Sequence, residues 1–234
     1  DLNKIEQHVR TFLQTANGHP ELLNTGELSD SLMNERGEQP FSQFIISLFQ
    51  GSHPHRLLFV TKSTDIHNLL NIDHNNKAVI SFSLNAPTVA ATFEKAPSPQ
   101  QRIEAAAKLA QAGYEVRVRI DPLVPVPNWQ NEYKRLVDMV FAKLTPKRIT
   151  LGSLRGLQST INFSTDRRWV DYLKERSNWG RRVDFGLRTE MYQTMLAYLS
   201  EEYGFTEVGL CKETLAVWGA VGMDYTRIKC NCIM

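Results

Sequence analysis

A short apolar run that ends in polar residues recurs along this chain, and this repetition constrains the fold more strongly than any single motif. Helical patterns separate the runs from one another. Apolar strands with polar ends, alternating with helices, are typical of a β/α barrel, which builds its site from the loops at one face. The runs and the polar residues that end them are 21–24 with Thr25-Gly26-Glu27, 57–60 with Thr61-Lys62, 78–82 with Ser83 and Asn85, and 116–120 with Asp121.

The order of the elements favours a parallel sheet. Five strands, the last at residues 148–152, alternate with helical segments, which indicates parallel pairing with right-handed crossovers. We therefore predict the α/β class and a barrel or half-barrel over residues 1–154. Such a fold begins with a strand, whereas this sequence opens at Asp1 with a helical pattern. We expect the first strand to lie upstream of Asp1.

Bulk properties exclude several classes of protein. The net charge of +2 is too small for the whole surface to bind nucleic acid, so any basic surface must be local. No apolar run approaches the roughly 20 residues of a membrane-spanning helix, and no secretory signal opens the sequence. The three cysteines, an odd number in a chain of this length, do not form a disulfide framework. We predict a cytoplasmic protein, away from membranes, whose cysteines are reduced thiols or ligands.

Residues 155–234 differ in character, and we predict that they form a C-terminal α+β extension. Between Arg155 and Arg188, eight basic and four acidic residues are interleaved with aromatic ones. This composition is typical of a nucleic-acid contact, although an amphipathic helix over residues 166–176 explains part of it equally well. We expect another helix at residues 190–203 and a last strand at residues 207–210. The candidate nucleic-acid residues are Arg167, Arg168, Trp179, Arg181 and Arg182.

The polar strand ends supply candidate binding groups. Lys62 can hold a carboxylate or a phosphate, or act as a base if it is desolvated. Glu27 can accept hydrogen bonds from an ammonium group, and Gly26 lets a ligand approach the backbone closely. Ser83 and Asn85 offer uncharged donors and acceptors, which suit recognition rather than acid-base chemistry.

Two further groups each admit more than one interpretation. Arg119 and Asp121 are two apart on a strand, so they point to the same face, either as site residues or as a buried structural ion pair. Cys211, Cys230 and Cys232 are potential metal or cluster ligands, but their spacing matches none of the strong metal signatures. Unconnected thiols, or a C-terminal thiol that gives up a hydrogen atom, are the other interpretations.

Six short motifs occur in a definite order along the chain. They are Thr-Gly-Glu-Leu-Ser-Asp-Ser-Leu (25–32), Phe-Val-Thr-Lys (59–62), Ser-Phe-Ser-Leu-Asn (81–85), Arg-Ile-Glu-Ala-Ala (102–106), Ala-Gly-Tyr (112–114) and Asn-Trp-Gly-Arg (178–181). In this order and spacing they resemble the spore photoproduct lyase family of radical S-adenosylmethionine enzymes. The resemblance covers most of the chain.

This resemblance implies a partial (β/α)6 TIM-like barrel. In that family a [4Fe-4S] cluster reduces S-adenosylmethionine to a 5′-deoxyadenosyl radical, which abstracts a hydrogen atom from the substrate. The resemblance implies a lyase of the DNA-repair type, a reductant protein for the cluster and an unassigned substrate, with nucleic acid as one class. The residues that it assigns to S-adenosylmethionine are Gly26, Glu27, Lys62, Ser83, Asn85, Arg119 and Asp121.

Two features of the family pattern do not occur in this sequence. The cluster motif Cys-x3-Cys-x2-Cys is absent, so we expect it upstream of Asp1 with the first strand. The lesion-repairing lyases carry a hydrogen-donor cysteine near the second strand, where this chain has Glu27 and no cysteine. A substrate other than the spore thymine lesion is therefore favoured. We hypothesise that Cys230 or Cys232 replaces the donor thiol, or ligates an auxiliary cluster together with Cys211.

Two other functions remain open from the residues alone. One is a non-catalytic barrel that binds nucleic acid through the surface at residues 167–188. The other is a β/α-barrel lyase or aldolase in which Lys62 forms a Schiff base.

Overall fold

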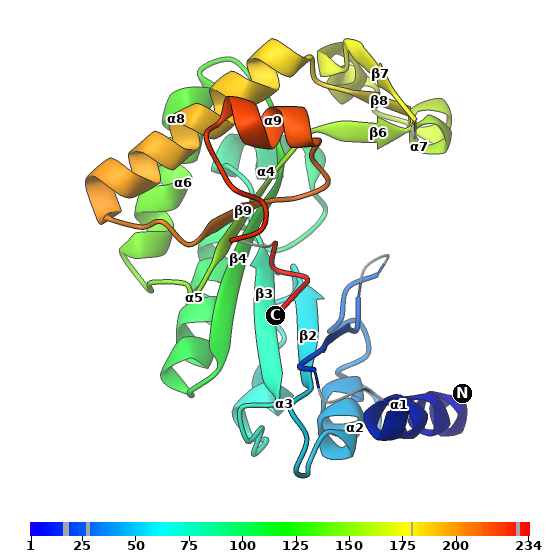
Figure 1. Ribbon diagram of the computed structural model, residues 1–234. Coiled ribbons are helices and arrows are strands. Elements are labelled where there is room, and N and C mark those ends of the chain that lie inside the picture. The colour runs from blue at the N-terminus through cyan, green and yellow to red at the C-terminus, as the bar shows by residue number, and fades with distance from the viewer. Residues whose placement is uncertain (16–18, 27–28, 179, 228–229) are drawn as a thin grey trace.

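A six-stranded parallel sheet forms the centre of the molecule (Figure 1). The computed structural model describes residues 1–15, 19–26, 29–178, 180–227 and 230–234, and the strand order within these residues is β1-β2-β3-β4-β5-β9. Parallel neighbours need crossover connections, which the helices between the strands supply. The strands are β1 (Leu22–Asn24), β2 (Arg56–Thr61), β3 (Ala78–Ser83), β4 (Glu115–Leu123), β5 (Ile149–Ser153) and β9 (Val208–Leu210).

Strand β4 shows why the two faces of the sheet differ. Charged and apolar residues alternate from Glu115 to Asp121, and successive side chains of a strand point to opposite faces. The apolar set packs in the hydrophobic core under the helices, whereas Arg117 and Arg119 lie on the opposite face, which we call the inner face. In the neighbouring strand, Ser81 and Ser83 pair with these two arginines in register. The inner face is therefore polar.

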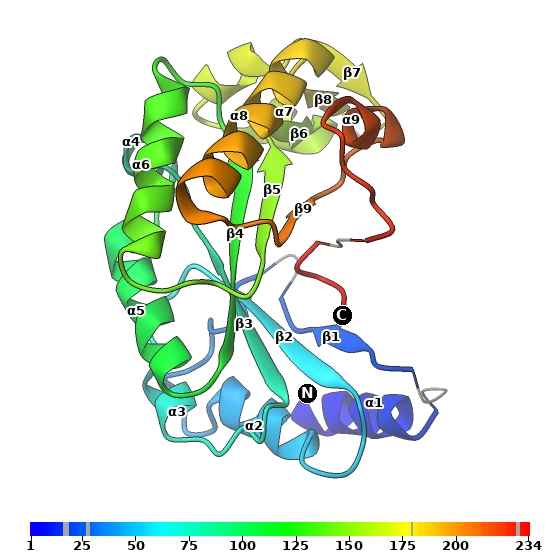
Figure 2. The same ribbon diagram turned by 60° about the vertical axis from the view of Figure 1, so that its left-hand side comes forward.

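Helices cover the other face of the sheet (Figure 2). Helix α5 contacts β3, β4 and α6, and it begins with a capping box between Ser98 and Gln101 followed by Pro99, as expected for a stable helix start. Among the described residues, no helix combines the length and the apolar character needed to cross a bilayer. The helices are α1 (Leu2–Thr15), α2 (Phe41–Leu48), α3 (His67–Leu70), α4 (Pro87–Phe93), α5 (Pro99–Gln111), α6 (Trp129–Phe141), α7 (Gln158–Phe163), α8 (Phe185–Tyr203) and α9 (Leu215–Ala220).

A small antiparallel sheet projects from the carboxyl end of β5 (Figure 1). Its strands are β6 (Arg155–Leu157), β7 (Glu175–Ser177) and β8 (Gly180–Arg182), in the order β6-β8-β7. The segment between β6 and β7 holds α7 and a 3-10 turn, Arg168–Tyr172. The helix predicted over residues 166–176 is therefore wrong, because it is replaced by this short 3-10 turn and because its last two residues, Glu175 and Arg176, pair with β8 in a strand.

The last residues of the chain fold back onto the inner face. We call residues 230–234 the C-terminal strap. Asn231 is fully buried: its main-chain N–H donates to Thr150 Oγ1 (2.8 Å), and its side-chain Nδ2 donates to Ser81 Oγ (3.0 Å) and the Val118 carbonyl (2.8 Å). These bonds fasten one residue to β3, β4 and β5. Arg117 Nη1 donates to the Asn231 carbonyl (2.8 Å), which completes the attachment.

The α/β class and the partial barrel are confirmed. Strand β9 belongs to the predicted C-terminal extension, after the division at residue 154. In the structure it pairs with β5 in the central sheet. Helix α8 begins at Phe185, five residues before the predicted start, because Asp184 caps it by accepting from the Leu187 N–H (3.0 Å). The division into two domains stays a prediction.

Candidate functional site

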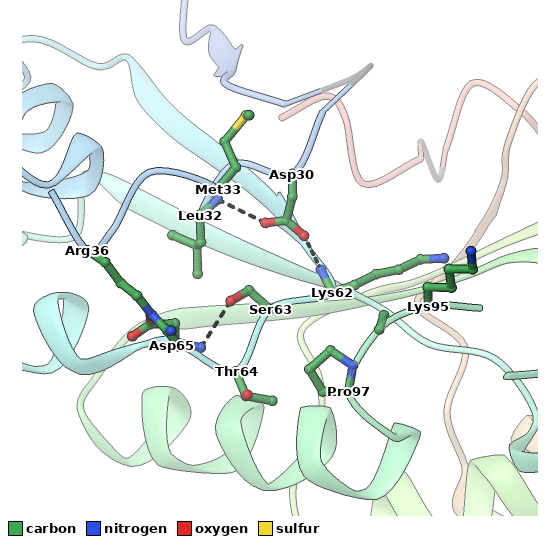
Figure 3. A pocket seen from close by; sticks show the side chains of 11 residues that line it. Asp30, Leu32, Met33, Arg36, Lys62, Ser63, Thr64, Asp65, Lys95 and Pro97 are labelled. Carbon is green, nitrogen blue, oxygen red and sulfur yellow. Dashed lines mark hydrogen bonds and ion pairs between the residues drawn. The ribbon is translucent and has the colours of Figure 1, made fainter. Parts of the chain in front are cut away.

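A cavity of about 470 Å³ opens at the carboxyl end of β2 (Figure 3). Three cations line it, Arg36, Lys62 and Lys95, together with the carboxylates of Asp30 and Asp65. This volume lies in the range of small-molecule sites, roughly 300–1,000 Å³. The mixture of both charges suits a zwitterionic ligand better than a simple anion.

Asp30 organises the wall of this cavity. Its carboxylate accepts from Thr61 Oγ1 (2.7 Å), the Lys62 N–H (2.7 Å) and the Leu32 N–H (2.9 Å), as Figure 3 shows for the two backbone donors. With three donors, Asp30 ties the segment after β1 to the end of β2. It fixes the backbone from which the Lys62 side chain extends.

Lys62 is paired inside the protein. Its Nζ donates to Glu94 Oε1 (2.8 Å), and the buried Arg102 pairs with the other oxygen of the same carboxylate. Burial raises the pKa of the Glu94 carboxyl, but the hydrogen bonds and charges of Lys62 and Arg102 outweigh it and hold this pKa below its ordinary value. The Lys62 side chain is 39% exposed, so its ammonium group remains within reach of a ligand in the cavity.

The predicted residues Gly26, Ser83 and Asn85 are held mainly by the protein itself. A Cβ at Gly26 would meet the Ser29 carbonyl at 2.6 Å, so the following loop already occupies the close approach that glycine allows. The Ser83 carbonyl accepts from Arg102 Nη1 (2.9 Å). Asn85 Oδ1 accepts from the Tyr133 hydroxyl (2.7 Å), and its Nδ2 donates to the Pro122 carbonyl near the end of β4 (3.0 Å). Glu27 lies outside the described residues.

Arg119 and Asp121 pair as their spacing predicts, and Arg155 joins them. Asp121 Oδ2 accepts from Arg119 Nη2 (3.1 Å) and from Arg155 Nη2 (3.0 Å). Burial raises the Asp121 pKa, but the two guanidinium groups outweigh it and keep this pKa below its ordinary value. Gly152 makes room for the carboxylate, since a Cβ there would lie 2.5 Å from Asp121 Cγ.

The same arginine brings the cysteines together. Arg119 Nη2 donates to Cys211 Sγ (2.8 Å), and its Nη1 donates to Cys232 Sγ (3.3 Å). Burial raises the pKa of Cys211 to about 11, so this residue is a thiol at neutral pH. A hydrogen bond to Cys232 raises the pKa of Cys230 as well. Three thiols that are far apart in the sequence thus gather on the inner face.

The residues that the structure describes do not fit a [4Fe-4S] cluster. The sequence has no Cys-x3-Cys-x2-Cys motif, and in the described ranges no group of three or more His, Cys, Asp and Glu side chains is arranged to hold a metal ion. A guanidinium group also lies against two of the sulfur atoms. The auxiliary-ligand role of Cys211, Cys230 and Cys232 stays a prediction.

The predicted nucleic-acid residues separate into two sets. Arg182 pairs with Glu175, Arg168 pairs with Asp166, and Arg167 Nη1 donates to the Ile161 carbonyl (2.9 Å). These three arginines are used within the protein. Trp179 lies outside the described residues.

Arg181 lies on the other side of the small sheet, directly opposite Arg176 in the β7–β8 ladder. Like charges in this position repel each other, and neither arginine has an acidic partner in the part of the chain that the structure describes. Both line a second cavity, of about 410 Å³, with Gln158 and Asn178. The arrangement is ready to accept an anion.

The sequence interpretation missed Asp30, Glu94, Arg155 and Arg176. Glu94 carried a usable signal: it follows the last turn of α4, where the helix dipole disfavours a carboxylate, so a cationic partner was to be expected. The sequence predicts a loop around Asp30 and a helix that includes Arg176, so neither residue was expected at a site. Arg155 is 34 positions from Asp121 in the sequence, and only the fold brings these two side chains together.

The fold and its polar carboxyl-end edge define a curled α/β half-barrel that presents its site at one rim. The family model described as spore photoproduct lyase matches residues 27–154, more than half of the chain. This chain therefore belongs to the spore photoproduct lyase family, and the resemblance inferred from the motifs is confirmed.

Curated relatives and solved structures agree with this family. Spore photoproduct lyase of Bacillus subtilis strain 168 is 32% identical over 151 residues, covering 59% of this chain and 43% of the relative. That of Clostridium acetobutylicum is 35% identical over 105 residues, covering 44% and 31%. This chain thus spans less than half of the length of these relatives.

The solved structures support the fold. A mutant spore photoproduct lyase with bound AdoMet and dinucleoside spore photoproduct has a TM-score of 0.74 at 20% identity, covering 90% of this chain and 66% of that one. Another structure, complexed with dinucleoside spore photoproduct, has a TM-score of 0.73 with the same coverage.

Proposed function

We propose that this chain forms the S-adenosylmethionine- and substrate-binding part of a radical S-adenosylmethionine lyase that repairs a pyrimidine photoproduct in DNA. The observation that carries the proposal is the family membership over residues 27–154, combined with a polar strand-end rim in a fold whose solved neighbours bind AdoMet and a dinucleoside photoproduct. Among the described residues no set of ligands fits the [4Fe-4S] cluster, so no step of the proposal passes through it.

The cavity at β2 suits S-adenosylmethionine by its size and charge. Lys62 and Lys95 would hold the carboxylate of the ligand, and Asp65, which lines the same cavity, would face its ammonium group. When bound, S-adenosylmethionine supplies the chemistry that removes a hydrogen atom from the substrate. The chain itself binds and orients the ligand, and the ion pair with Glu94 holds Lys62 Nζ in position.

Lys62→Ala tests this assignment. Loss of a charged hydrogen bond should weaken S-adenosylmethionine binding by about 1.5–3 kcal/mol, which isothermal titration calorimetry measures as a rise in Kd. The fold should persist, because Glu94 keeps Arg102 as its partner. Lys108→Ala, at an exposed position of α5, is the matched control. An unchanged Kd for Lys62→Ala would remove this residue from the site.

The DNA part of the proposal is supported by the small sheet. Arg176 and Arg181 point away from the Glu175–Arg182 pair because neighbouring strand residues alternate in direction. Both arginines are exposed and lie opposite each other on neighbouring strands. A phosphate bound between their guanidinium groups would offset the repulsion between the two positive charges. Phe163 in the adjacent α7 is 85% exposed, and an exposed aromatic ring beside arginines provides a stacking surface for a base.

The Arg176→Gln/Arg181→Gln double variant should bind DNA more weakly and with less salt dependence. Each lost phosphate contact lowers the slope of log K against log salt by about 0.9, so the slope should fall by roughly 2 in a fluorescence anisotropy titration. Lys4→Gln/Arg10→Gln removes the same charge from α1, at the opposite end of the molecule (Figure 1), and should leave the slope unchanged. Equal slopes for both variants would contradict the assignment.

The chain has Glu27 after β1, where the lesion-repairing lyases carry their hydrogen-donor cysteine. This difference does not argue against a DNA photoproduct as substrate. The C-terminal strap lies on the inner face, where Cys232 contacts Arg119, and this position supports the proposal that Cys230 or Cys232 returns the hydrogen atom. Two functions from the sequence remain untested predictions: a non-catalytic DNA-binding barrel and a Schiff-base lyase using Lys62. DNA binding without any S-adenosylmethionine binding would favour the first.

A further inference from the structure

The C-terminal strap holds two cysteines in one turn. The Ile233 N–H donates to the Cys230 carbonyl (3.3 Å), which closes a turn over residues 230–233. Because a turn shortens the distance between residues two apart, Cys230 and Cys232 lie closer than in an extended strand. Both are partly exposed, and their side chains are hydrogen-bonded to each other.

The turn is held firmly in place. Asn231, between the two cysteines, is fully buried with bonds to three strands. Arg148 Nη1 donates to the carbonyls of Cys230 (3.1 Å) and Ile233 (3.1 Å). The backbone that carries both thiols is therefore fixed on the inner face.

The two thiols differ in their surroundings. Cys232 Sγ accepts from Arg119 Nη1 (3.3 Å), and a cation beside a cysteine sulfur favours reaction through its thiolate form. The Cys230 pKa is raised, first by its hydrogen bond to Cys232 and then by burial, so Cys230 keeps its proton. One thiol in contact with a guanidinium group, next to a second thiol whose pKa is raised, is the asymmetry of a redox-active cysteine pair.

We propose that Cys230 and Cys232 form a thiol–disulfide redox site that reacts with small disulfides. The Cys232 thiolate attacks one sulfur of the disulfide R–S–S–R, which forms a mixed disulfide and releases one RS⁻. Cys230 then loses its proton and attacks Cys232 Sγ, which forms the Cys230–Cys232 disulfide and releases the second RS⁻. The two protein thiols are oxidised by two electrons, and the small disulfide is reduced to two thiols.

This site goes beyond the proposed function and has a consequence for it. The disulfide removes both S–H hydrogens from the strap, so an oxidised chain would have no hydrogen atom to donate from these residues. It also changes the sulfur that contacts Arg119. Oxidation would thus stop the thiol chemistry of the strap without changing the proposed DNA-binding surface on the small sheet.

The experiment treats the reduced chain with glutathione disulfide, blocks remaining thiols with iodoacetamide and analyses tryptic peptides by mass spectrometry. Cleavage after Lys229 releases residues 230–234. This peptide should be two hydrogens lighter and unalkylated in the wild type and in Cys211→Ser. A cross-link between Cys232 and Cys211, or full alkylation of both strap cysteines, would overturn the proposal.

A rate comparison tests the role of Arg119. Mixed-disulfide formation should be about tenfold faster in Cys230→Ser, which keeps Cys232, than in Cys232→Ser, because Arg119 contacts the Cys232 sulfur and a neighbouring cation makes a thiol more reactive. Arg119→Gln should abolish this difference, whereas Arg148→Gln, which touches only carbonyls of the strap, should preserve it. Equal rates in the two cysteine variants would refute Cys232 as the attacking thiol. This readout needs no S-adenosylmethionine, cluster or DNA, so its failure leaves the proposed function standing.

Discussion

Asp121→Asn is expected to lower the free energy of unfolding by about 3–5 kcal/mol, the range for breaking a buried ion pair while its partners stay in place. The side chain of Asp121 is 7% exposed, and its carboxylate pairs with the guanidinium groups of Arg119 and Arg155. The asparagine keeps the shape but not the charge. Two arginines would then share a confined space without a counterion, beside the thiols of Cys211 and Cys232. Urea unfolding followed by circular dichroism measures the change.

The matched control is Asp166→Asn. Asp166 also pairs with an arginine, Arg168, but this pair is exposed, and exposed ion pairs contribute little to stability. The control should unfold at nearly the wild-type urea concentration. If both variants lost the same stability, burial of the Asp121 network would not be the reason for its importance.

The pH dependence gives Asp121 a second test. Its folded-state pKa lies below the ordinary value, so the carboxylate stabilises the fold above the unfolded pKa of about 3.9, and this contribution is lost as the pH falls through the folded pKa. Wild-type stability should therefore decrease in acid below about pH 4. The asparagine introduced by Asp121→Asn cannot titrate, so the difference in stability between the two proteins should shrink in that range.

The sequence predicted the parts of this structure that depend on local spacing. Alternation along Glu115 to Asp121 placed Arg119 and Asp121 on one face, and their pairing is confirmed. The strand ends carrying Lys62 and Ser83 were found because apolar runs stop there. These features need only the period of a strand and the rule that parallel strands end at one rim.

Contacts that join distant segments could not be predicted in this way. Arg119 meets Cys232 across 113 positions, and the burial of Asn231 depends on three strands that only the folded sheet brings together. No pattern in the last five residues indicates an inner-face strap. The sequence identified the three cysteines as candidate residues. Only the structure shows that Arg119 contacts two of them, Cys211 and Cys232.

The error over residues 166–176 has a different cause. Aromatic residues at helical spacing favoured an amphipathic helix, but β7 pairs with β8 as an antiparallel strand, with Ser177 opposite Gly180. An Asn followed two positions later by a Gly with positive φ is a turn signal. The structure follows this turn signal and not the helical spacing of the aromatic residues. As a result, Arg176 lies opposite Arg181.

Arg102→Met is the second substitution with a large expected effect. Arg102 is fully buried in α5 and donates to the Pro97 carbonyl (2.6 Å), the Ser83 carbonyl (2.9 Å) and Glu94. Methionine keeps most of the apolar stem but leaves two carbonyls and a carboxylate without this donor. We expect a loss of about 3–5 kcal/mol in the free energy of unfolding. Arg10→Met, in an exposed pair on α1, should change it little.

A double-mutant cycle separates the charge effect from a packing effect. In the Arg102→Met background the Glu94 carboxylate keeps only the partly exposed Lys62, so neutralising it with Glu94→Gln should recover part of the lost stability. In the wild-type background the same Glu94→Gln change should be destabilising, because it leaves Arg102 buried without its counterion. If Glu94→Gln had the same effect in both backgrounds, the two residues would not be coupled, and the position of Lys62 at the cavity would need another explanation.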